Sequence, residues 1–137
     1  MVGRKMINGT HKHGITTRTQ KIWLGDDGIV RYESHPGSEE SLEDAQENVK
    51  AGASLSGGMK RPILINSRGI KSLRREARMY YAGEENAKHT IAAAIVISSP
   101  VARVIANFFM GLNKTKFPTR LFTSEEMAIA WLKEFLA

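Results

Sequence analysis

The sequence contains no cysteine, which excludes disulfides, thiol catalysis and thiolate metal sites. It also lacks a long hydrophobic run. Its longest apolar stretch, Ile91 to Ile97, is far shorter than the roughly 20 residues that a bilayer span needs. The N-terminus has no continuous apolar segment, so it does not resemble a secretory signal. These absences predict a cytoplasmic protein without a membrane span.

The chain has the size and composition of one globular domain. It is 137 residues long, with 42% hydrophobic and 25% charged residues. Its net charge of +6 is unevenly distributed, because residues 25–50 carry eight acids whereas residues 51–82 carry seven basic residues and one acid. A basic segment of this kind indicates an acidic partner and says nothing about the fold.

The N-terminal part predicts a tail followed by a hairpin. Residues 1–17 mix glycine, threonine, histidine and basic residues without a period, which indicates a flexible tail before a single domain at 18–137. The Asp-Gly turn chemistry of residues 25–28 lies between two β-prone runs. This pattern predicts a β-hairpin with strands at 20–24 and 29–34.

The middle of the chain predicts a helix, a buried strand and a second helix. The first helix is expected to open near Ser38 or Ser41, in an acidic first turn that suits the helix dipole. The short apolar run Pro62–Ile65 indicates a buried strand. A loop at 66–71 then leads to a second helix that starts near Ser72.

The C-terminal part continues the alternation of strands and helices. Residues 90–98 are apolar on both faces, which is typical of a central strand covered by helices. Ser99 is placed to cap a third helix with a clear 3.6-residue period. A last strand is expected at 119–122, followed by a final helix that Thr123 and Glu126 open as a capping box.

The predicted order is β-β-α-β-α-β-α-β-α, an α/β domain with a mostly parallel five-stranded sheet and four helices. The order and several local segments resemble the anti-sigma-factor-antagonist (STAS) fold, and most closely a bacterial, SpoIIAA-like, STAS/SEC14-related subgroup of unknown function. The resemblance covers about residues 18–137. The segments that carry it are 70–72, 75–78, 99–103, 105–109, 111–114 and 118–122.

The resemblance implies a switch or docking module rather than an enzyme. The better-known STAS domains are phosphorylated on a serine within an Asp-Ser-Ser-Gly-like loop between the third strand and the second helix. In this chain Asn66 stands in the place of the aspartate and Arg68 in the place of the acceptor serine. This departure argues against the phosphorylation switch. Ser67 and Ser72 remain as alternative acceptors, and nothing in the sequence requires either.

One edge of the predicted sheet is the candidate ligand site. Ligands of open α/β sheets bind outside the carboxyl ends of the strands, and helix N-termini favour anions. Two loops leave such ends here, at 66–72 and 98–100. The alternative is that the serines only cap helices and the basic side chains form a solvated face. The candidate anion- or partner-binding residues are Asn66, Ser67, Arg68, Lys71, Ser72, Arg75, Ser98 and Ser99.

A second candidate surface is apolar. Phe108, Phe109 and Met110 exceed what one narrow helix stripe can bury, so they form either a contact surface for a partner or a second copy of the chain, or a layer beneath the final helix. Nucleic acid is disfavoured, because aromatic residues are not interleaved with the basic run and no nucleic-acid motif is present.

No cofactor or metal is predicted. His11 and His13 are a two-residue pair in the tail without further ligands. The leading interpretation is a non-enzymatic protein-interaction or regulatory module whose partner is another protein. The alternative is a small-molecule or lipid-binding protein of the SEC14-like kind. A third class is an enzyme built on Ser67 and Ser99.

Overall fold

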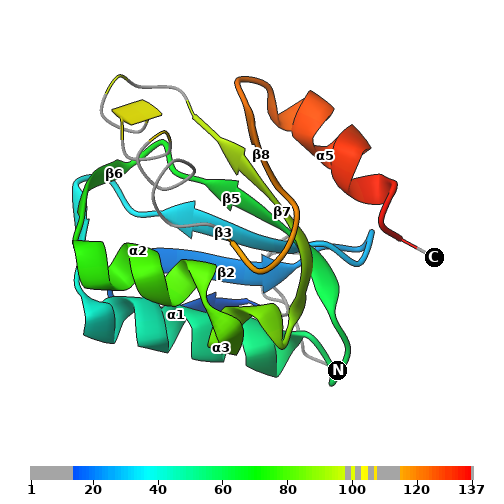
Figure 1. The fold of residues 1–137 in the computed structure, drawn as a ribbon, viewed down its shortest axis with the longest axis horizontal. Coiled ribbons are helices and arrows are strands. Elements are labelled where there is room, and N and C mark those ends of the chain that lie inside the picture. Colours follow the sequence, from blue (N-terminus) through cyan, green and yellow to red (C-terminus); the bar gives the residue numbers. More distant parts are fainter. Residues whose placement is uncertain (1–13, 98–99, 101–102, 105–106, 108–114, 137) are drawn as a thin grey trace.

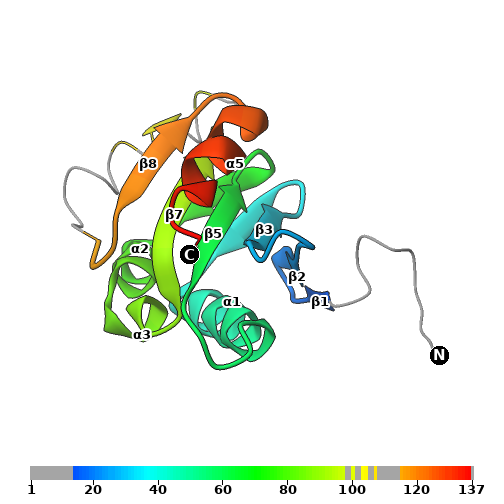
Figure 2. The same cartoon turned by 90° about the vertical axis from the view of Figure 1, so that its right-hand side faces the viewer.

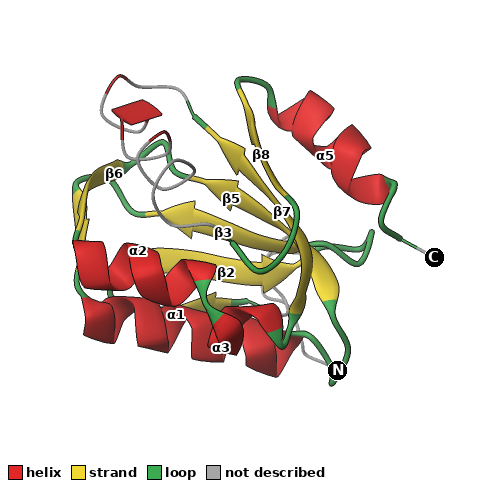
Figure 3. Ribbon diagram, viewed as in Figure 1, coloured by secondary structure: helices red, strands yellow, loops and turns green. Residues whose placement is uncertain are grey.

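The computed structural model describes residues 14–97, 100, 103–104, 107 and 115–136 (Figures 1 and 3). Within them lie a six-stranded sheet of order β1-β2-β3-β5-β7-β8 and a two-stranded sheet of β4 and β6. The strands are β1 (Ile15–Thr16), β2 (Gln20–Leu24), β3 (Val30–Ser34), β4 (Ser38–Glu40), β5 (Arg61–Asn66), β6 (Ile70–Leu73), β7 (Thr90–Val96) and β8 (Thr119–Phe122). The described helices are α1 (Leu42–Leu55), α2 (Arg75–Ala82), α3 (Glu84–Ala87) and α5 (Glu125–Lys133).

The main sheet confirms the predicted α/β class. Strands β2 and β3 form the antiparallel hairpin, and β3, β5, β7 and β8 run parallel to one another. The expected neighbourhood of Pro62–Ile65 and residues 90–98 is confirmed, because β5 pairs with β7 and Ile63 lies opposite Ala93. Parallel neighbours of this kind need crossover connections, and α1 lies between β3 and β5 in the chain, as α2 and α3 do between β5 and β7.

Helices cover both faces of the sheet. Figure 2 shows α1, α2 and α3 on one face and α5 on the other. Successive side chains of a strand point to opposite faces. Ile63 therefore joins the core on the α1 side, whereas Leu64 joins the core on the α5 side. Ala93 and Ala94 divide in the same way, which explains the uninterrupted apolar runs at 62–65 in β5 and 91–96 in β7.

The first helix begins where the sequence predicts. Ser41 is its N-cap, and its side chain accepts a hydrogen bond from the backbone N–H of Asp44. The Asp44 carboxylate accepts from the backbone N–H of Ser41 at 2.9 Å, which completes a capping box. Arg18 donates from Nε to the same carboxylate at 2.8 Å. The segment before β2 is thereby attached to the start of α1.

Three short strands, β1, β4 and β6, and the short helix α3 were not predicted. β1 falls within the expected tail, so Ile15–Thr16 belong to the sheet, while residues 1–13 lie outside the described part of the chain. β4 and β6 replace what was expected to be a helix start and a loop. Both depend on each other for backbone hydrogen bonds, and neither has a strong pattern of its own.

Two predicted helix starts were wrong by one to three residues. The second helix begins at Arg75 with Arg74 as N-cap, because Ser72 is held in β6. The last helix is capped by Ser124, whose side chain accepts from the backbone N–H of Met127 at 3.3 Å, and not by Thr123. The predicted third helix, capped by Ser99, falls largely outside the described residues.

Protonation of Asp44 is expected to weaken the attachment of Arg18. The Arg18 guanidinium and the Ser41 donors lower the pKa of Asp44 from 3.8 to about 2. A carboxylate with a lowered pKa stabilises the fold above its unfolded pKa, so this contribution is lost as the pH falls from about 4 to about 2. Because Arg18 is exposed, Asp44→Asn should lower the free energy of unfolding by only about 1 kcal/mol at neutral pH.

Urea denaturation at neutral pH and near pH 2 measures the contribution of Asp44 to the free energy of unfolding. The difference between wild type and Asp44→Asn should disappear at the acidic end. Glu43→Gln, at an exposed position of the same helical turn, is the control and should be nearly neutral at both pH values. A loss that is equal at both pH values would contradict the ion pair as its cause.

Helix α1 approaches the sheet closely at Gly52. A Cβ atom at this position would lie 1.7 Å from the hydroxyl oxygen and 2.7 Å from Cζ of Tyr32. Tyr32 is a core residue that is 7% exposed, and burial raises the pKa of its hydroxyl. The tyrosine ring therefore occupies the space that any larger residue at position 52 would need.

Gly52→Ala should destabilise the protein by about 1–3 kcal/mol, because overpacking a filled core outweighs the better helix propensity of alanine. Adding Tyr32→Phe removes the closest atom and should recover part of the loss. Gln46→Ala, at an exposed position of the same helix, should change the free energy of unfolding by less than about 0.5 kcal/mol. Urea denaturation of wild type, Gly52→Ala, Gly52→Ala/Tyr32→Phe and Gln46→Ala measures these differences. An unchanged free energy of unfolding in Gly52→Ala would refute the close contact.

Candidate functional site

The carboxyl ends of three parallel strands meet at one edge of the sheet. Glu33 of β3 pairs with Asn66 of β5, and Asn66 pairs with Val96 of β7, so the three strand ends are level. The chain leaves β5 and continues through β6 into α2 at this edge (Figure 1). Four exposed basic residues lie on this stretch, and we call them the basic rim: Arg68, Lys71, Arg74 and Arg75.

The turn after β5 is held tightly against the end of β3. The backbone N–H of Arg68 donates to Oδ1 of Asn66 at 3.0 Å, which closes the turn. Gly69 follows, and a Cβ atom there would lie 2.7 Å from the carbonyl oxygen of Ser34. This packing places Arg68 beside a surface groove whose other lining residues are Lys21, Glu33, Ser34, His35, Pro36 and Gly69.

Ser67 lies in the interior and not on the rim. It is 9% exposed, and its hydroxyl donates to the carbonyl oxygen of Val96 at 2.9 Å. Its backbone N–H donates to the same oxygen at 3.3 Å. Ser67 therefore joins the ends of β5 and β7. This corrects its prediction as a partner-binding or phosphate-accepting residue.

Ser72 and Lys71 belong to strand β6. Ser72 is half-buried and lies opposite Glu39 of β4, so the second helix does not start near it as predicted. The register shifts at Lys71, which has no partner residue in the β4 ladder. Such a bulge turns the side chains on either side of it. As a result Ile70 and Leu73, three residues apart, line the same cavity.

The remaining predicted site residues are Arg75, which the structure describes, and five others that it does not. Arg75 is exposed at the first position of α2, as expected of a rim residue. The other five residues lie outside the described part of the chain: Ser98, Ser99, Phe108, Phe109 and Met110.

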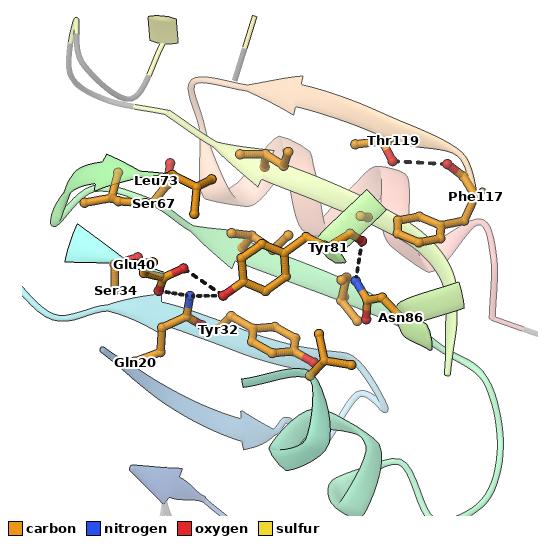
Figure 4. Close-up of a pocket in the computed structure, with 16 residues that line it drawn as sticks. Gln20, Tyr32, Ser34, Glu40, Ser67, Leu73, Tyr81, Asn86, Phe117 and Thr119 are labelled. Atoms are coloured by element: carbon orange, nitrogen blue, oxygen red, sulfur yellow. Dashed lines mark hydrogen bonds between the residues drawn. The ribbon is translucent and has the colours of Figure 1, made fainter. Parts of the chain in front are cut away.

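Behind the rim lies a cavity of about 90 Å³. It lies between the main sheet and the residues of α1, α2 and β6 that pack over the same face (Figure 4). Its apolar wall is formed by Tyr32, Val49, Ile63, Ile65, Ile70, Leu73, Ala93, Ile95 and Phe117. Its more polar lining residues are Gln20, Ser34, Glu40, Ser67, Tyr81, Asn86 and Thr119.

A buried carboxylate lies at one side of this cavity. Glu40 is 1% exposed. Its Oε1 accepts a hydrogen bond from the Tyr81 hydroxyl at 2.7 Å, and its Oε2 accepts from Gln20 Nε2 at 2.7 Å (Figure 4). Asn48 donates from Nδ2 to Oε2 at 3.3 Å and to the Tyr81 hydroxyl at 2.9 Å. A carboxylate accepts and does not donate, so these donors satisfy it without a cation.

The same cluster affects Tyr81. Burial, followed by the negative charge of Glu40, raises the pKa of the Tyr81 hydroxyl well above 10.0. The hydroxyl therefore stays protonated at neutral pH and remains a donor to Glu40. We call Gln20, Glu40, Asn48 and Tyr81 the Glu40 cluster. No sequence pattern indicates this cluster, because its four members come from a strand, an acidic run and two helices.

The described residues contain neither a metal-ligand group nor a membrane-spanning helix. No group of three or more histidine, aspartate or glutamate side chains is arranged there to hold a metal ion. Within the same part of the chain, every helix is too short or too polar to traverse a bilayer.

The architecture defines a SpoIIAA-like domain. A similar structure is that of an uncharacterized DUF3478-family protein with a SpoIIAA-like fold from Shewanella loihica PV-4, at 20% identity and a TM-score of 0.54. The similarity covers 87% of this chain and 99% of that one. A protein of unknown function from Arthrobacter sp. FB24 is 30% identical over 85% of this chain and 99% of its own, with a TM-score of 0.33.

A family model also matches the chain at the level of sequence. The chain belongs to the family described as Domain of unknown function (DUF7793), whose model matches residues 22–136. No curated protein matches the chain. The structural similarity to the Shewanella protein confirms the expected SpoIIAA-like fold.

Removing the Tyr81 hydroxyl should destabilise the fold. Tyr81→Phe leaves Glu40 and Asn48 each without one hydrogen-bond partner in the interior, which typically costs about 1–3 kcal/mol. Tyr80→Phe is the matched control, because the neighbouring hydroxyl makes no hydrogen bond within the described residues. Urea denaturation of both variants measures the difference. Equal stabilities would show that the Glu40 cluster does not contribute to folding.

Proposed function

We propose that this protein is a non-enzymatic interaction module that docks an acidic protein partner on its basic rim. The observation that carries the proposal is the exposure of four basic side chains within the eight residues 68–75. Among the described residues Lys71 is the one member with an ion pair, to Glu39 at 3.8 Å, and both side chains are exposed. The charge of the rim is therefore available to a partner.

The start of α2 adds to this charge. Arg74 is the N-cap, and its side chain makes no capping hydrogen bond. The backbone N–H groups of the first turn carry a partial positive charge, which favours carboxylates. The basic rim and the helix dipole thus attract the same kind of group.

The position of Ser67 supports a non-enzymatic role. An enzyme at this edge would need an accessible nucleophile beside a base. Ser67 is instead buried and donates to a backbone carbonyl. The SEC14-like alternative has less support, because the cavity of about 90 Å³ is smaller than the roughly 300–1,000 Å³ of ligand pockets for drug-sized molecules.

A charge reversal on the rim tests the proposal. The probe is a fluorescein-labelled peptide of eight glutamates, and its binding is followed by fluorescence anisotropy at low salt. The double variant Arg68→Glu/Arg75→Glu should bind at least about tenfold more weakly than wild type, and the difference should shrink as salt screens the charges.

Lys60→Glu and Lys133→Glu, combined in one chain, make the same change of net charge at exposed positions: Lys60 precedes β5, at the opposite end of that strand from the rim, and Lys133 is the last residue of α5. This control should retain most of the binding. Equal losses in the two double variants would mean that only net charge matters and would refute a docking site. Tighter binding of a single-stranded oligonucleotide than of the peptide would refute the choice of a protein partner.

A further inference from the structure

Two aromatic rings hold one arginine at the corner where strand β8 meets α5. β8 is the last strand of the main sheet, and Figure 2 shows it beside α5. Arg120 lies opposite Ala94 of β7, which belongs to the core on the α5 side, so its side chain lies on that face of the sheet. Its Cζ atom is 5.3 Å from the ring centroid of Phe122 and 5.7 Å from that of Trp131.

The rings form a fixed support for the guanidinium. The ring centroids of Phe122 and Trp131 are 5.8 Å apart, and Phe135 packs edge-on against Trp131 at 5.0 Å. All three residues are half-buried and pack against the core on the α5 side. A guanidinium held against ring faces keeps its N–H donors at the edge of its plane, where a carboxylate can accept two of them at once. Arg120 is therefore oriented for a carboxylate.

The acidic side chains of this chain leave Arg120 without such a partner. All 14 aspartate and glutamate residues fall within the described ranges. The ion pairs that they form involve Arg18, Arg31, Lys71 and Lys88. Arg120 is exposed, and its guanidinium is in none of these pairs. Its charge is therefore available to a carboxylate of another molecule.

An exposed apolar side chain lies beside this arginine. Met127 is 62% exposed and lies one helical turn before Trp131, on the same side of α5. Arginine, methionine and aromatic residues are the types that are enriched in protein interfaces, and tryptophan and arginine contribute most to their binding energy. An apolar side chain next to the bound carboxylate would therefore cover Met127 and Trp131.

We propose that Arg120, Phe122, Met127 and Trp131 form a docking site for a segment of another protein, and we call it the Arg120 corner. The segment places a carboxylate on Arg120 and a neighbouring apolar side chain on Met127 and Trp131. The charge of the arginine and the exposed methionine define these two requirements separately, so a ligand that meets only one of them binds more weakly.

The charges of α5 favour a protein over a nucleic acid as the partner. Glu125 and Glu126 in its first turn and Glu134 at its C-cap are exposed, against one exposed lysine, Lys133. Such a helix repels the repeated charges of a phosphate backbone, whereas a single carboxylate has only to reach the guanidinium. Because α5 and α2 lie on opposite faces of the sheet, the proposal is independent of docking at the basic rim (Figure 2).

Two-dimensional NMR of the isotope-labelled full-length protein tests the proposal. The chain has two tryptophans. The indole N–H of Trp131 reports on the Arg120 corner, and that of Trp23, on β2 towards the other edge of the sheet, is the internal reference. The first probe is the blocked tripeptide acetyl-Leu-Asp-Leu-amide. It should give a saturable shift at Trp131 and none at Trp23, and a spectrum without a saturable shift at Trp131 would overturn the proposal.

Two further tripeptides separate the two requirements. Acetyl-Leu-Asn-Leu-amide lacks the charge, and acetyl-Gly-Asp-Gly-amide lacks the apolar side chains. Each should bind at least about threefold more weakly than the first probe. Equal affinity of either for the protein would refute the corresponding contact and overturn the proposal. Tighter binding of a single-stranded oligothymidylate than of the first probe would overturn the choice of a protein partner.

A conservative variant locates the carboxylate contact. Arg120→Lys keeps the charge but loses the planar fork and the stacking, so it should bind acetyl-Leu-Asp-Leu-amide at least about threefold more weakly. Lys133→Gln, on a different side of α5 from Trp131, is the control and should bind as wild type does. An unchanged Trp23 signal should confirm that both variants fold. Equal affinities of Arg120→Lys and wild type would overturn the proposal.

The rim variant and the oligomeric state complete the test. Arg68→Glu/Arg75→Glu should bind the first probe as wild type does, and a loss of the Trp131 shift in this variant would overturn the Arg120 corner as a separate site. Sedimentation velocity should give the same oligomeric state for wild type and Arg120→Glu. Dimers of the wild type that Arg120→Glu dissociates would make a second copy of the chain the occupant and overturn the choice of another protein.

Discussion

The arrangement of the α2 side of the molecule depends on one buried carboxylate. The side chain of Glu40 accepts hydrogen bonds from Gln20 of β2, Asn48 of α1 and Tyr81 of α2. Its backbone carbonyl accepts from the N–H of Arg74, the N-cap of α2. Burying a carboxylate is costly unless such donors are present, so these four segments have to assemble together. Their assembly fixes where α2 begins relative to the sheet edge.

The position of the rim follows from this constraint. Glu40 lies opposite Leu73 in the β4–β6 ladder, and α2 starts two residues after Leu73. Once Glu40 is fixed, Arg74 and Arg75 are held at the edge where β3, β5 and β7 end. The bulge at Lys71 then turns Ile70 and Leu73 toward the cavity while Lys71 stays exposed. One short strand therefore forms both the outer surface of the rim and the inner wall of the cavity.

The regular part of the fold could be predicted because each element carries its own pattern. β7 is apolar on both faces, and Ser41 with Asp44 signals the start of α1. The Glu40 cluster could not be predicted in this way. Glu40 belongs to an acidic run that is typical of solvent-exposed residues, and its burial depends on Gln20 and Tyr81, which lie 20 and 41 residues away in the chain. Local sequence cannot indicate a hydrogen-bond partner at that separation.

The shared strand also limits how the cavity and the rim can influence each other. A ligand changes the rim only as far as it binds two arrangements of β6 with different affinity. Ile70 and Leu73 contact the cavity, but the backbone of Leu73 is paired with Glu40, whose side chain is itself held by three donors. Movement of β6 would have to break this cluster. Any change in the cavity that leaves the cluster intact therefore leaves the charge presented at the rim unaltered.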